Sequence, residues 1–279
     1  MLRKNLNKGL VKEVIKESAN IFSLYIEILT KHKRYIAGQF ISIDPYQFQE
    51  LSDTLLFFEQ IKKRKESARA YSLLSSPLES FIILTIKIEN FRKETEYPPM
   101  LSPFLASSFM KNRYIYFSEY SGNYMLPLNV PANSCIIHII SGSGIIPSLS
   151  ILKYDLFQNR LATTQHILIY INKTLKNTLF FSTLQKLESL YPKRFKMLNI
   201  YTKENFNFSK NDLTKIISQY VINNNVIAIF VCGASNNRWE KRRSNKLGIA
   251  LPSKFVEFIS FILTSCKIPK NKIKMEFYG

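Results

Sequence analysis

The chain has 279 residues, of which 46% are hydrophobic, and its 39 Lys and Arg against 20 Asp and Glu give a formal net charge of +19. This apolar content suffices for a buried core, so the composition excludes a wholly disordered chain. No apolar run approaches the ~20 residues that cross a bilayer, and the N-terminus lacks the apolar core of a signal peptide. We therefore predict a cytoplasmic protein without a membrane span.

The positive charge is compatible with nucleic acid, acidic lipid or an acidic protein as a partner. Lysines are spread along the whole chain, and no zinc finger, helix-turn-helix or aromatic RNA-binding signature accompanies them. A nucleic-acid binder is thus a hypothesis that rests on charge alone, and we expect no specific nucleic-acid partner.

The sequence predicts no metal site. Three cysteines are too few for a four-cysteine iron–sulfur or zinc site, and reduced thiols fit best. The three histidines lack metal-ligand spacing, so each is interpreted as a surface or structural residue. The residues concerned are Cys135, Cys232 and Cys266, and His32, His138 and His166.

The first half of the chain has the pattern of short strands, several with alternating apolar residues. One short helix is expected at residues 102–109, with Ser102 as its N-cap. An antiparallel barrel is the natural closure for such a set of strands. The strand-like runs are LVKEVIKE (10–17), FSLYIEIL (22–29), QFISID (39–44), ARAYSLL (68–74), FIILTIKIE (81–89), YIYFSEY (114–120) and YMLPL (124–128).

In the second half, apolar strands alternate with helical stretches, which is the βαβ rhythm of a parallel, Rossmann-like sheet covered on both faces. The expected strands are SCIIHII (134–140), HILIYI (166–171), FKMLNIY (195–201), VIAIFV (226–231) and KIKMEFY (272–278), and the expected helices are 146–157, 178–190, 212–221 and 255–265. We predict two domains, 1–130 and 131–279. Segments 46–67 and 235–251 fit neither rhythm and are interpreted as insertions.

Glycines follow the first buried strand of the second half, in ISGSGIIP (140–147). Gly142 and Gly144 allow a tight turn and close approach of a ligand, and the following helix N-terminus suits a dinucleotide diphosphate. The spacing is not a full GxGxxG, and an ordinary strand-to-helix turn is an equally good interpretation. Later, VCGA (231–234) ends a strand where ligands bind to open parallel sheets. Taken alone, Cys232 and Gly233 are better explained by tight packing.

The stretch RAYSLLSSP (69–77) combines a cation, a flat ring and hydroxyl groups. Arg69 is suited to neutralise a diphosphate, Tyr71 to stack on a flat ring, and Ser72 to hydrogen-bond a ring nitrogen. These motifs, in this order, resemble the ferredoxin–NADP(+) reductase superfamily, in particular the reductase components of bacterial oxygenases. The resemblance extends over nearly the full length and includes GQF (38–40), RAYS (69–72), SPFL (102–105), SGNY (121–124), GSGIIP (142–147), NKT (172–174), VCGA (231–234) and EFYG (276–279).

The resemblance implies an FAD-binding β-barrel, residues 1–130, followed by an NAD(P)-binding α/β domain, residues 131–279. By this resemblance Arg69 contacts the FAD diphosphate, Tyr71 lies against the isoalloxazine and Ser72 bonds near its N5. Met100, Leu101 and Ser102 continue the flavin site.

On the nucleotide side, the resemblance implies that Gly142, Ser143 and Gly144 receive the nicotinamide nucleotide. Cys232 and Gly233 would lie beside its reactive carbon, and Phe277 would cover the other flavin face. Lys173 and the Thr202–Lys203 pair follow strands that approach the adenosine end, where cations suit the 2′-phosphate of NADP(H). The alternative is that these lysines are solvated, so NADP(H) is favoured only slightly over NAD(H).

The predicted function is a flavin-dependent oxidoreductase that passes electrons from NADPH or NADH through FAD to an acceptor. Because the chain lacks the cysteines of a fused cluster domain, we expect a separate acidic electron-transfer protein, a ferredoxin or oxygenase component. RWEKRRSNK (238–246) is interpreted equally well as its docking site or as a solvated loop. YPPMLSPF (97–104) and the Ala234 of VCGA depart from the family pattern, so the alternative is a non-catalytic binding or regulatory module on the same scaffold.

Overall fold

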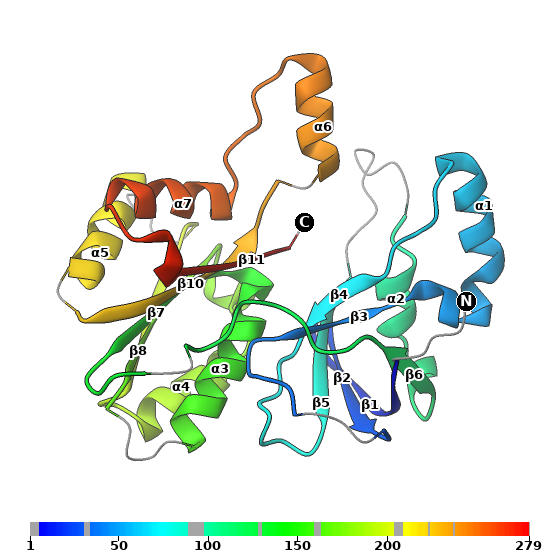
Figure 1. Cartoon of the computed structure of the whole chain (residues 1–279), viewed down its shortest axis with the longest axis horizontal. Coiled ribbons are helices and arrows are strands. Elements are labelled where there is room, and N and C mark those ends of the chain that lie inside the picture. Colours follow the sequence, from blue (N-terminus) through cyan, green and yellow to red (C-terminus); the bar gives the residue numbers. More distant parts are fainter. Residues whose placement is uncertain are drawn as a thin grey trace. The chain divides into compact units, whose positions relative to one another are not determined.

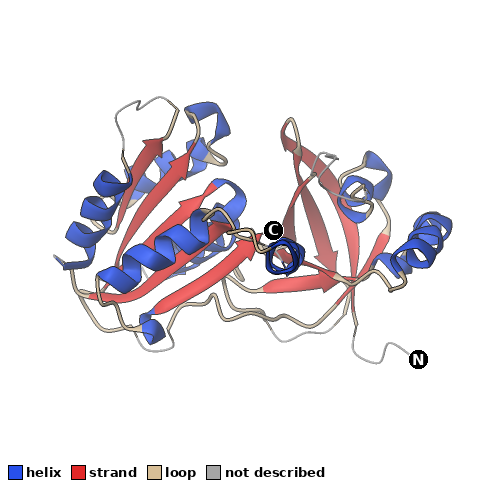
Figure 2. Ribbon diagram, turned by 90° about the horizontal axis from the view of Figure 1, so that it is seen from above, coloured by secondary structure: helices blue, strands red, loops and turns tan. Residues whose placement is uncertain are grey.

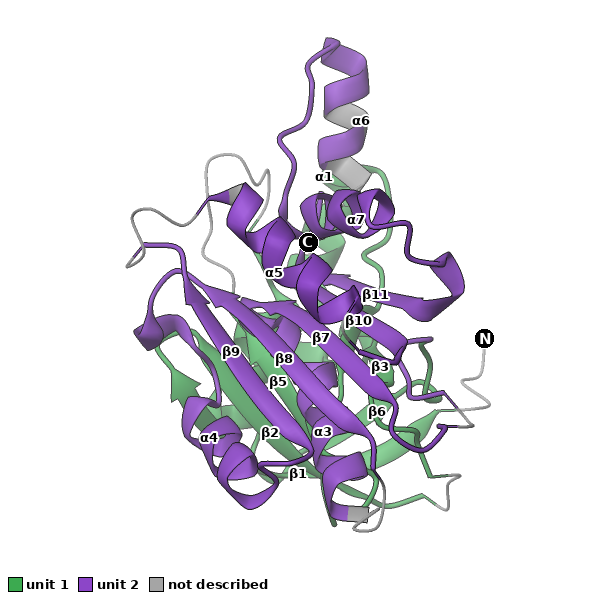
Figure 3. Ribbon diagram, turned by 90° about the vertical axis from the view of Figure 1, so that its left-hand side faces the viewer, with its two compact units in different colours: residues 1–122 green, residues 123–279 purple. Residues whose placement is uncertain are grey.

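The computed structural model describes residues 6–30, 34–88, 98–127, 130–158, 163–203, 209–222, 224–236 and 238–278. The chain divides into two compact units, residues 1–122 and residues 123–279 (Figure 3). Each unit has a core of its own, and the two are described in turn. The domain assignment made from the sequence, with FAD in the first domain and NAD(P) in the second, stays a prediction.

The described residues of unit 1 form six antiparallel strands (Figure 1). One sheet has the order β5-β2-β1-β6, and β3 pairs with β4. Bridges from Leu73 to Leu84 and from Phe40 to Ser121 join this pair to β5 and to the chain after β6. The strands therefore follow one another in a ring, and the predicted antiparallel barrel is confirmed. Their bounds are β1 (Asn7–Ser18), β2 (Ile21–Ile28), β3 (Phe40–Ile43), β4 (Arg69–Ser72), β5 (Ile82–Lys87) and β6 (Tyr114–Phe117).

Apolar side chains that point inward from the strands fill the interior of unit 1. In β3, Ile41 and Ile43 are fully buried, whereas Phe40 and Ser42 are only half-buried. The residues of β5 from Ile82 to Ile86 are all buried, which explains why this run has no polar alternation. Leu101 and Leu105 of the short helix α2 (Leu101–Leu105) complete the same core.

Two sequence predictions for this region are wrong. The described part of YMLPL, residues 124–127, forms no strand. Tyr124 is instead buried by contacts within unit 2, and Pro127 has no N–H to donate to a ladder. Ser102 is not an N-cap, because α2 begins one residue before it and its carbonyl accepts a hydrogen bond from the Ala106 N–H at 3.1 Å.

Both segments interpreted as insertions contain a helix. In unit 1, α1 (Ser52–Lys62) buries Leu55, and it ends at Lys62 because the next residue, Lys63, has a φ of 52°. In unit 2, α6 (Arg238–Leu247) is held to the start of α7 by Lys254 Nζ, which binds Glu240 Oε1 and Oε2 at 2.6 and 2.7 Å.

Unit 2 is a five-stranded parallel sheet of order β11-β10-β7-β8-β9. Helices α3 and α4 lie on one face of this sheet, and α5 and α7 lie on the other (Figure 1); Figure 2 shows the same helices flanking the strands. The predicted Rossmann-like fold is confirmed, with every expected strand and helix present. The bounds are β7 (Cys135–Ser141), α3 (Ile145–Gln158), β8 (Gln165–Asn172), α4 (Phe181–Leu190), β9 (Phe195–Tyr201), α5 (Lys210–Ile222), β10 (Val226–Ala234), α7 (Phe255–Ser265) and β11 (Ile273–Tyr278).

Successive side chains of β7 lie on opposite faces of the sheet. Ile137 and Ile139 belong to the apolar core formed with α5 and α7. The intervening His138 is also fully buried, on the other face, where its ring stacks on that of Phe230 at 5.2 Å. Among the described residues, no helix combines the length and apolarity that crossing a membrane requires.

A chain of hydrogen-bonded polar side chains is buried on the His138 face of the sheet. It runs from Tyr124 Oη to Ser148 Oγ (2.7 Å), from Ser148 Oγ to His138 Nδ1 (3.0 Å), from His138 Nε2 to His166 Nδ1 (3.1 Å), and from His166 Nε2 to Asp155 Oδ2 (2.9 Å). Arg194 Nη2 donates to the same carboxylate oxygen at 2.8 Å. His138 and His166 are thus buried structural residues, while His32 lies outside the described residues.

The charge state of this chain follows from its burial. Burial lowers the pKa of His138 well below its ordinary value, and the neighbouring His166 lowers it further. Burial alone would raise the pKa of Asp155, but the hydrogen bond from His166 and the Arg194 guanidinium hold it below its ordinary value. His138 is therefore neutral in the folded protein, and the carboxylate is ionised.

We expect the stability of the protein to fall as the pH drops below about 6.5, the ordinary pKa of histidine. Below that pKa, His138 takes up a proton in the unfolded chain but not in the folded protein. Its contribution to the free energy of unfolding is therefore fully present above pH 6.5, and at lower pH it is lost at up to ~1.4 kcal/mol per pH unit. Urea unfolding between pH 7.5 and 5 measures this slope. His138→Gln should reduce it, and an unchanged slope in that variant would contradict the assignment.

Candidate functional site

The turn after β7 is fixed by side chains from the neighbouring strand. Residues Gly142–Gly144 form a 3₁₀ turn that leads directly into α3. The Gly142 N–H donates to Asn172 Oδ1 at 3.2 Å, and the Gly142 carbonyl accepts from Tyr170 Oη at 2.8 Å. Gly142 has a φ of +56°, a conformation that favours glycine. The last residues of β8 thus determine how this turn leaves the sheet.

The same turn lies against the backbone at the end of β10. A Cβ on Gly144 would be 2.3 Å from the carbonyl oxygen of Cys232 and 3.0 Å from the nitrogen of Gly233, so only glycine fits. A Cβ on Gly142 would meet no atom within 4 Å. The turn is therefore closed on the side of β10 and open at Gly142, which leaves room for a ligand at the N-terminus of α3.

The predicted nucleotide residues gather at the carboxyl edge of the sheet, where the strand order reverses between β7 and β10. Open parallel sheets bind ligands at such a point. Gly233 pairs with Phe277 of β11, whose side chain is 63% exposed. Cys232 is fully buried, and Lys173, directly after β8, is exposed. Ser143, in the turn itself, is half-buried.

The predicted flavin residues of β4 follow the alternation of that strand. Arg69 and Tyr71 lie on one face, opposite Ile43 and Ile41 of β3, whereas Ser72 faces the other way and is 3% exposed. Tyr71 is half-buried against the apolar core of unit 1. Burial raises the pKa of the Tyr71 hydroxyl, and the positive charge of Arg69 offsets only part of this rise. The hydroxyl is therefore protonated at neutral pH.

Arg69 is held in place by the segment that follows α1. Its guanidinium forms an ion pair with Glu66, which also binds Lys62 at 3.0 Å. The N–H of Glu66 donates to Tyr46 Oη at 3.0 Å. The guanidinium has further donors beyond the one that binds Glu66. These contacts orient a half-exposed cation beside Tyr71.

The remaining predicted flavin residues lie at the start of α2. Leu101 is buried in the core of unit 1, and Met100 and Ser102 are half-buried. Tyr71 packs against the same core, so β4 and the start of α2 share one apolar cluster. Within each unit, therefore, the structure brings the predicted residues of that unit into a common region.

Sequence reasoning missed Tyr170 and Asn172 as residues that shape the glycine turn. Asn172 was included in the NKT motif without a role, yet it is 5% exposed and its Nδ2 also donates to Thr178 Oγ1 at 3.3 Å. Tyr170 is the one hydroxyl in the run HILIYI. A polar side chain inside a buried strand was the signal that could have identified each of them.

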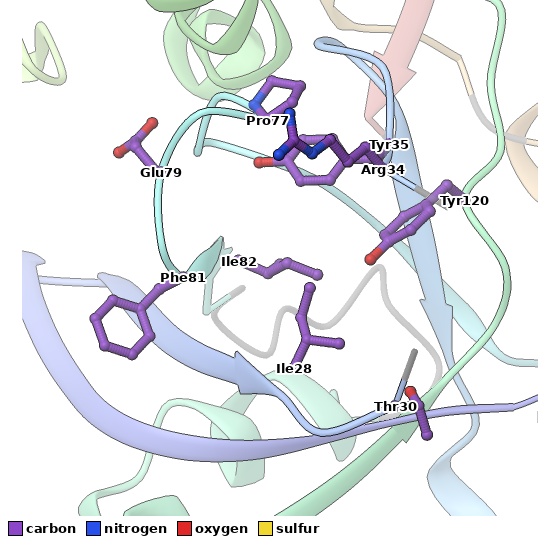
Figure 4. A pocket seen from close by; sticks show the side chains of 9 residues that line it. All are labelled: Ile28, Thr30, Arg34, Tyr35, Pro77, Glu79, Phe81, Ile82 and Tyr120. Carbon is purple, nitrogen blue, oxygen red and sulfur yellow. The ribbon is translucent and has the colours of Figure 1, made fainter. Parts of the chain in front are cut away.

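Unit 1 also contains a pocket that none of the predicted site residues lines (Figure 4). Its volume is about 200 Å³. Tyr35 Oη donates to Ser75 Oγ at 2.7 Å, and the ring of Tyr35 lies 5.3 Å from that of Tyr120. No sequence motif indicated this pocket. It is lined by Ile28, Thr30, Arg34, Tyr35, Pro77, Glu79, Phe81, Ile82 and Tyr120.

Comparison with known proteins agrees with this geometry. Residues 139–237, which include the glycine turn and the end of β10, match the sequence model of the oxidoreductase NAD-binding domain. Flavohemoprotein A of Dictyostelium discoideum is 23% identical over 97% of this chain and 59% of its own length. The ferredoxin reductase component of 3-ketosteroid-9-alpha-monooxygenase from Mycobacterium tuberculosis is 24% identical over 90% of this chain and 57% of its own length. The chain thus spans less than three fifths of these curated relatives.

Solved structures share the fold. Ferredoxin-NADP+ reductase from Plasmodium falciparum superposes with a TM-score of 0.68, at 21% identity, over 99% of this chain and 97% of that one. The flavohem-like FAD/NAD binding domain of nitric oxide dioxygenase from Vibrio cholerae gives a TM-score of 0.67 at 18% identity, over 98% of both chains.

The antiparallel barrel followed by a Rossmann-like domain, with a glycine turn at its switch point, is the two-domain fold that this chain shares with these solved structures. These comparisons support the resemblance to the ferredoxin–NADP(+) reductase superfamily that the motifs predicted.

We expect Gly144→Ala to destabilise the protein by about 3 kcal/mol, because the added methyl group overlaps backbone atoms of β10 that cannot move aside. Gly142→Ala is the matched control. It meets open space and is expected to cost only about 1 kcal/mol for its positive φ. Urea unfolding measures the free energy of unfolding of both variants. Equal losses of stability would show that the close contact of Gly144 with β10 does not require glycine.

Proposed function

We propose that this protein is a flavin-dependent NAD(P)H oxidoreductase. It would bind FAD on unit 1, accept electrons from NADPH or NADH bound on unit 2, and pass them to an iron–sulfur or haem acceptor. The single observation that carries the proposal is the open glycine turn at the switch point of the parallel sheet, within the stretch that matches the oxidoreductase NAD-binding domain.

The side chains of unit 1 fit an FAD. A half-exposed guanidinium and a half-buried aromatic ring lie on the same face of β4, which suits a diphosphate and a flat ring. In this proposal Arg69 binds the diphosphate and Tyr71 lies against the isoalloxazine. Ser72 would hydrogen-bond near N5, with Met100, Leu101 and Ser102 completing the site. FAD itself supplies the hydride and single-electron chemistry.

The residues of unit 2 fit a nicotinamide nucleotide. The open turn of Gly142, Ser143 and Gly144 would receive the nucleotide, assisted by the N-terminal dipole of α3. Cys232 and Gly233 lie near the end of β10, beside this turn, in the proposed position of the reactive carbon. Phe277, exposed on β11, would cover a flavin face.

The proposed acceptor is an acidic electron-transfer protein, a ferredoxin or oxygenase component. One relative is named a ferredoxin reductase component and another a flavohemoprotein, which supports an iron–sulfur or haem acceptor. The helix α6 carries five Lys and Arg residues and one Glu, a charge that complements an acidic surface. The cytoplasmic location predicted from cysteine usage is part of the same proposal.

The first test is the visible absorption of the purified protein after incubation with FAD, followed by anaerobic addition of NADPH or NADH. A yellow protein that bleaches with either nucleotide is expected. Arg69→Ala should weaken FAD binding by at least about tenfold, because a charge-assisted contact to the diphosphate is lost. Arg113→Ala is the matched control, since Arg113 also pairs with a glutamate, Glu50, but lies outside the proposed site.

A protein that takes up no FAD would refute the proposal and favour the non-catalytic module. Equal FAD dissociation constants for Arg69→Ala and Arg113→Ala would instead refute only the role of Arg69.

The proposal favours NADP(H) through Lys173, which is exposed at the carboxyl end of β8. Lys173→Ala is expected to raise the KM for NADPH about tenfold and to leave the KM for NADH unchanged, because only NADPH carries a 2′-phosphate. Lys186→Ala, an exposed lysine of α4, serves as the control. Equal effects of Lys173→Ala on both nucleotides would contradict this role.

A further inference from the structure

The helix α1 presents large apolar side chains outward as well as inward. Leu55 is 1% exposed and anchors the helix in unit 1. Three other apolar side chains of the helix are exposed: Leu56, Phe57 and Ile61 are 53%, 57% and 49% exposed. Phe57 and Ile61 are four residues apart and are therefore neighbours on the helix surface, and Leu56 is a further exposed apolar side chain in the same two turns. We call Leu56, Phe57 and Ile61 the outer apolar face of α1.

This outer face departs from the usual pattern of a surface helix, which turns polar residues to water. Single exposed apolar residues are common and need no explanation, but a contiguous group marks an interaction site. The helix lies at the margin of unit 1 (Figure 1).

A cluster of cations directly follows the outer apolar face. Lys63, Arg64 and Lys65 are all exposed, and they follow the last residue of α1. Of the nearby carboxylates, Glu66 is engaged with Lys62 and Arg69. Glu59 accepts a hydrogen bond from Tyr46 Oη. Among the charged residues of α1, Asp53, in the first turn, remains an exposed acid at the opposite end of the helix from the cations.

We propose that the outer apolar face of α1 and the cations Lys63–Lys65 form a docking surface for an anionic phospholipid bilayer. Apolar side chains on one helix face insert at the boundary of headgroups and acyl chains, while adjacent Lys and Arg bind anionic headgroups. This charge complementarity selects lipid as the occupant.

The docking is peripheral and reversible. A single short helix with three apolar side chains gives marginal binding, so the basic cluster is required as a second attachment. The effect would be to hold the protein at an anionic membrane surface, whatever reaction it catalyses. The inference rests on α1 and its charges alone and does not depend on the proposed function.

The experiment is co-sedimentation of the full chain with vesicles of phosphatidylcholine alone or with 30% phosphatidylserine, at about 150 mM salt, where long-range surface attraction is screened. Binding to the anionic vesicles is expected. Leu56→Ser/Phe57→Ser should lower the partition coefficient about tenfold or more, because the apolar insertion is lost. Phe261→Ser, which changes a 70% exposed residue of α7, is the matched control and should bind like the unchanged protein.

A second pair of variants separates the basic cluster from the overall charge of +19. Replacing Lys63, Arg64 and Lys65 by Gln should abolish most binding to anionic vesicles. Replacing the exposed Lys186, Lys246 and Lys270 by Gln removes the same charge elsewhere and should have little effect. Equal losses in the two triple variants would overturn the proposal, because they would show that net charge alone drives binding.

Insertion is observed directly with Phe57→Trp. Its tryptophan emission should shift to the blue with anionic vesicles and be quenched by brominated acyl chains. Trp239 contributes a constant background, which the unchanged protein measures. A Phe57→Trp variant whose extra emission is unaffected by vesicles would overturn the proposal. The same result would follow if the outer face bound another protein instead of lipid.

Discussion

The close approach of the glycine turn to the end of β10 is the constraint on which the rest of unit 2 depends. The backbone of Gly144 lies so close to Cys232 that a Cβ on Gly144 would be only 2.3 Å from the Cys232 carbonyl oxygen. This contact brings the ends of β7 and β10 together at the switch point. Tyr170 and Asn172 hold the other side of the turn through its carbonyl and N–H groups. Three neighbouring strands thus determine the direction in which α3 leaves the sheet, and with it the position of the helix dipole.

In unit 1, side-chain contacts from an inserted segment position the residues around β4. There, a segment inserted between β3 and β4 supplies Glu66, which pairs with Arg69, and Tyr46 accepts a hydrogen bond from the backbone of Glu66. Ion pairs of half-exposed residues contribute little to stability. Their effect is to limit the rotamers of a long cation, which reduces the entropy lost when that cation binds an anion. The inserted helix therefore contributes to the candidate site as well as presenting its own outer surface.

The buried chain of polar side chains in unit 2 shows how a core can contain two histidines and still satisfy their hydrogen-bonding groups. When both imidazole rings are neutral, the carboxylate of Asp155 accepts from His166, His166 accepts from His138, His138 from Ser148, and Ser148 from Tyr124. Every donor then has an acceptor, as buried polar groups require. Because Tyr124 is the second residue of unit 2, these hydrogen bonds also connect the start of the unit to β7, β8 and α3.

The sequence by itself determined the two-part fold, since alternating runs and βαβ rhythm depend on local periodicity. It also predicted the resemblance to the ferredoxin–NADP(+) reductase superfamily, because RAYS, GSGIIP and VCGA are local motifs in a fixed order. Ser102 was misjudged as a cap and 124–127 as a strand because helix starts and strand pairing depend on partners that a local pattern does not reveal. Only the tertiary structure decided that Gly144, and not Gly142, is sterically required, that Tyr170 and Asn172 hold the turn, and that two histidines share one buried chain. Each of these rests on contacts between residues distant in sequence, and spacing along the chain carries no record of such contacts.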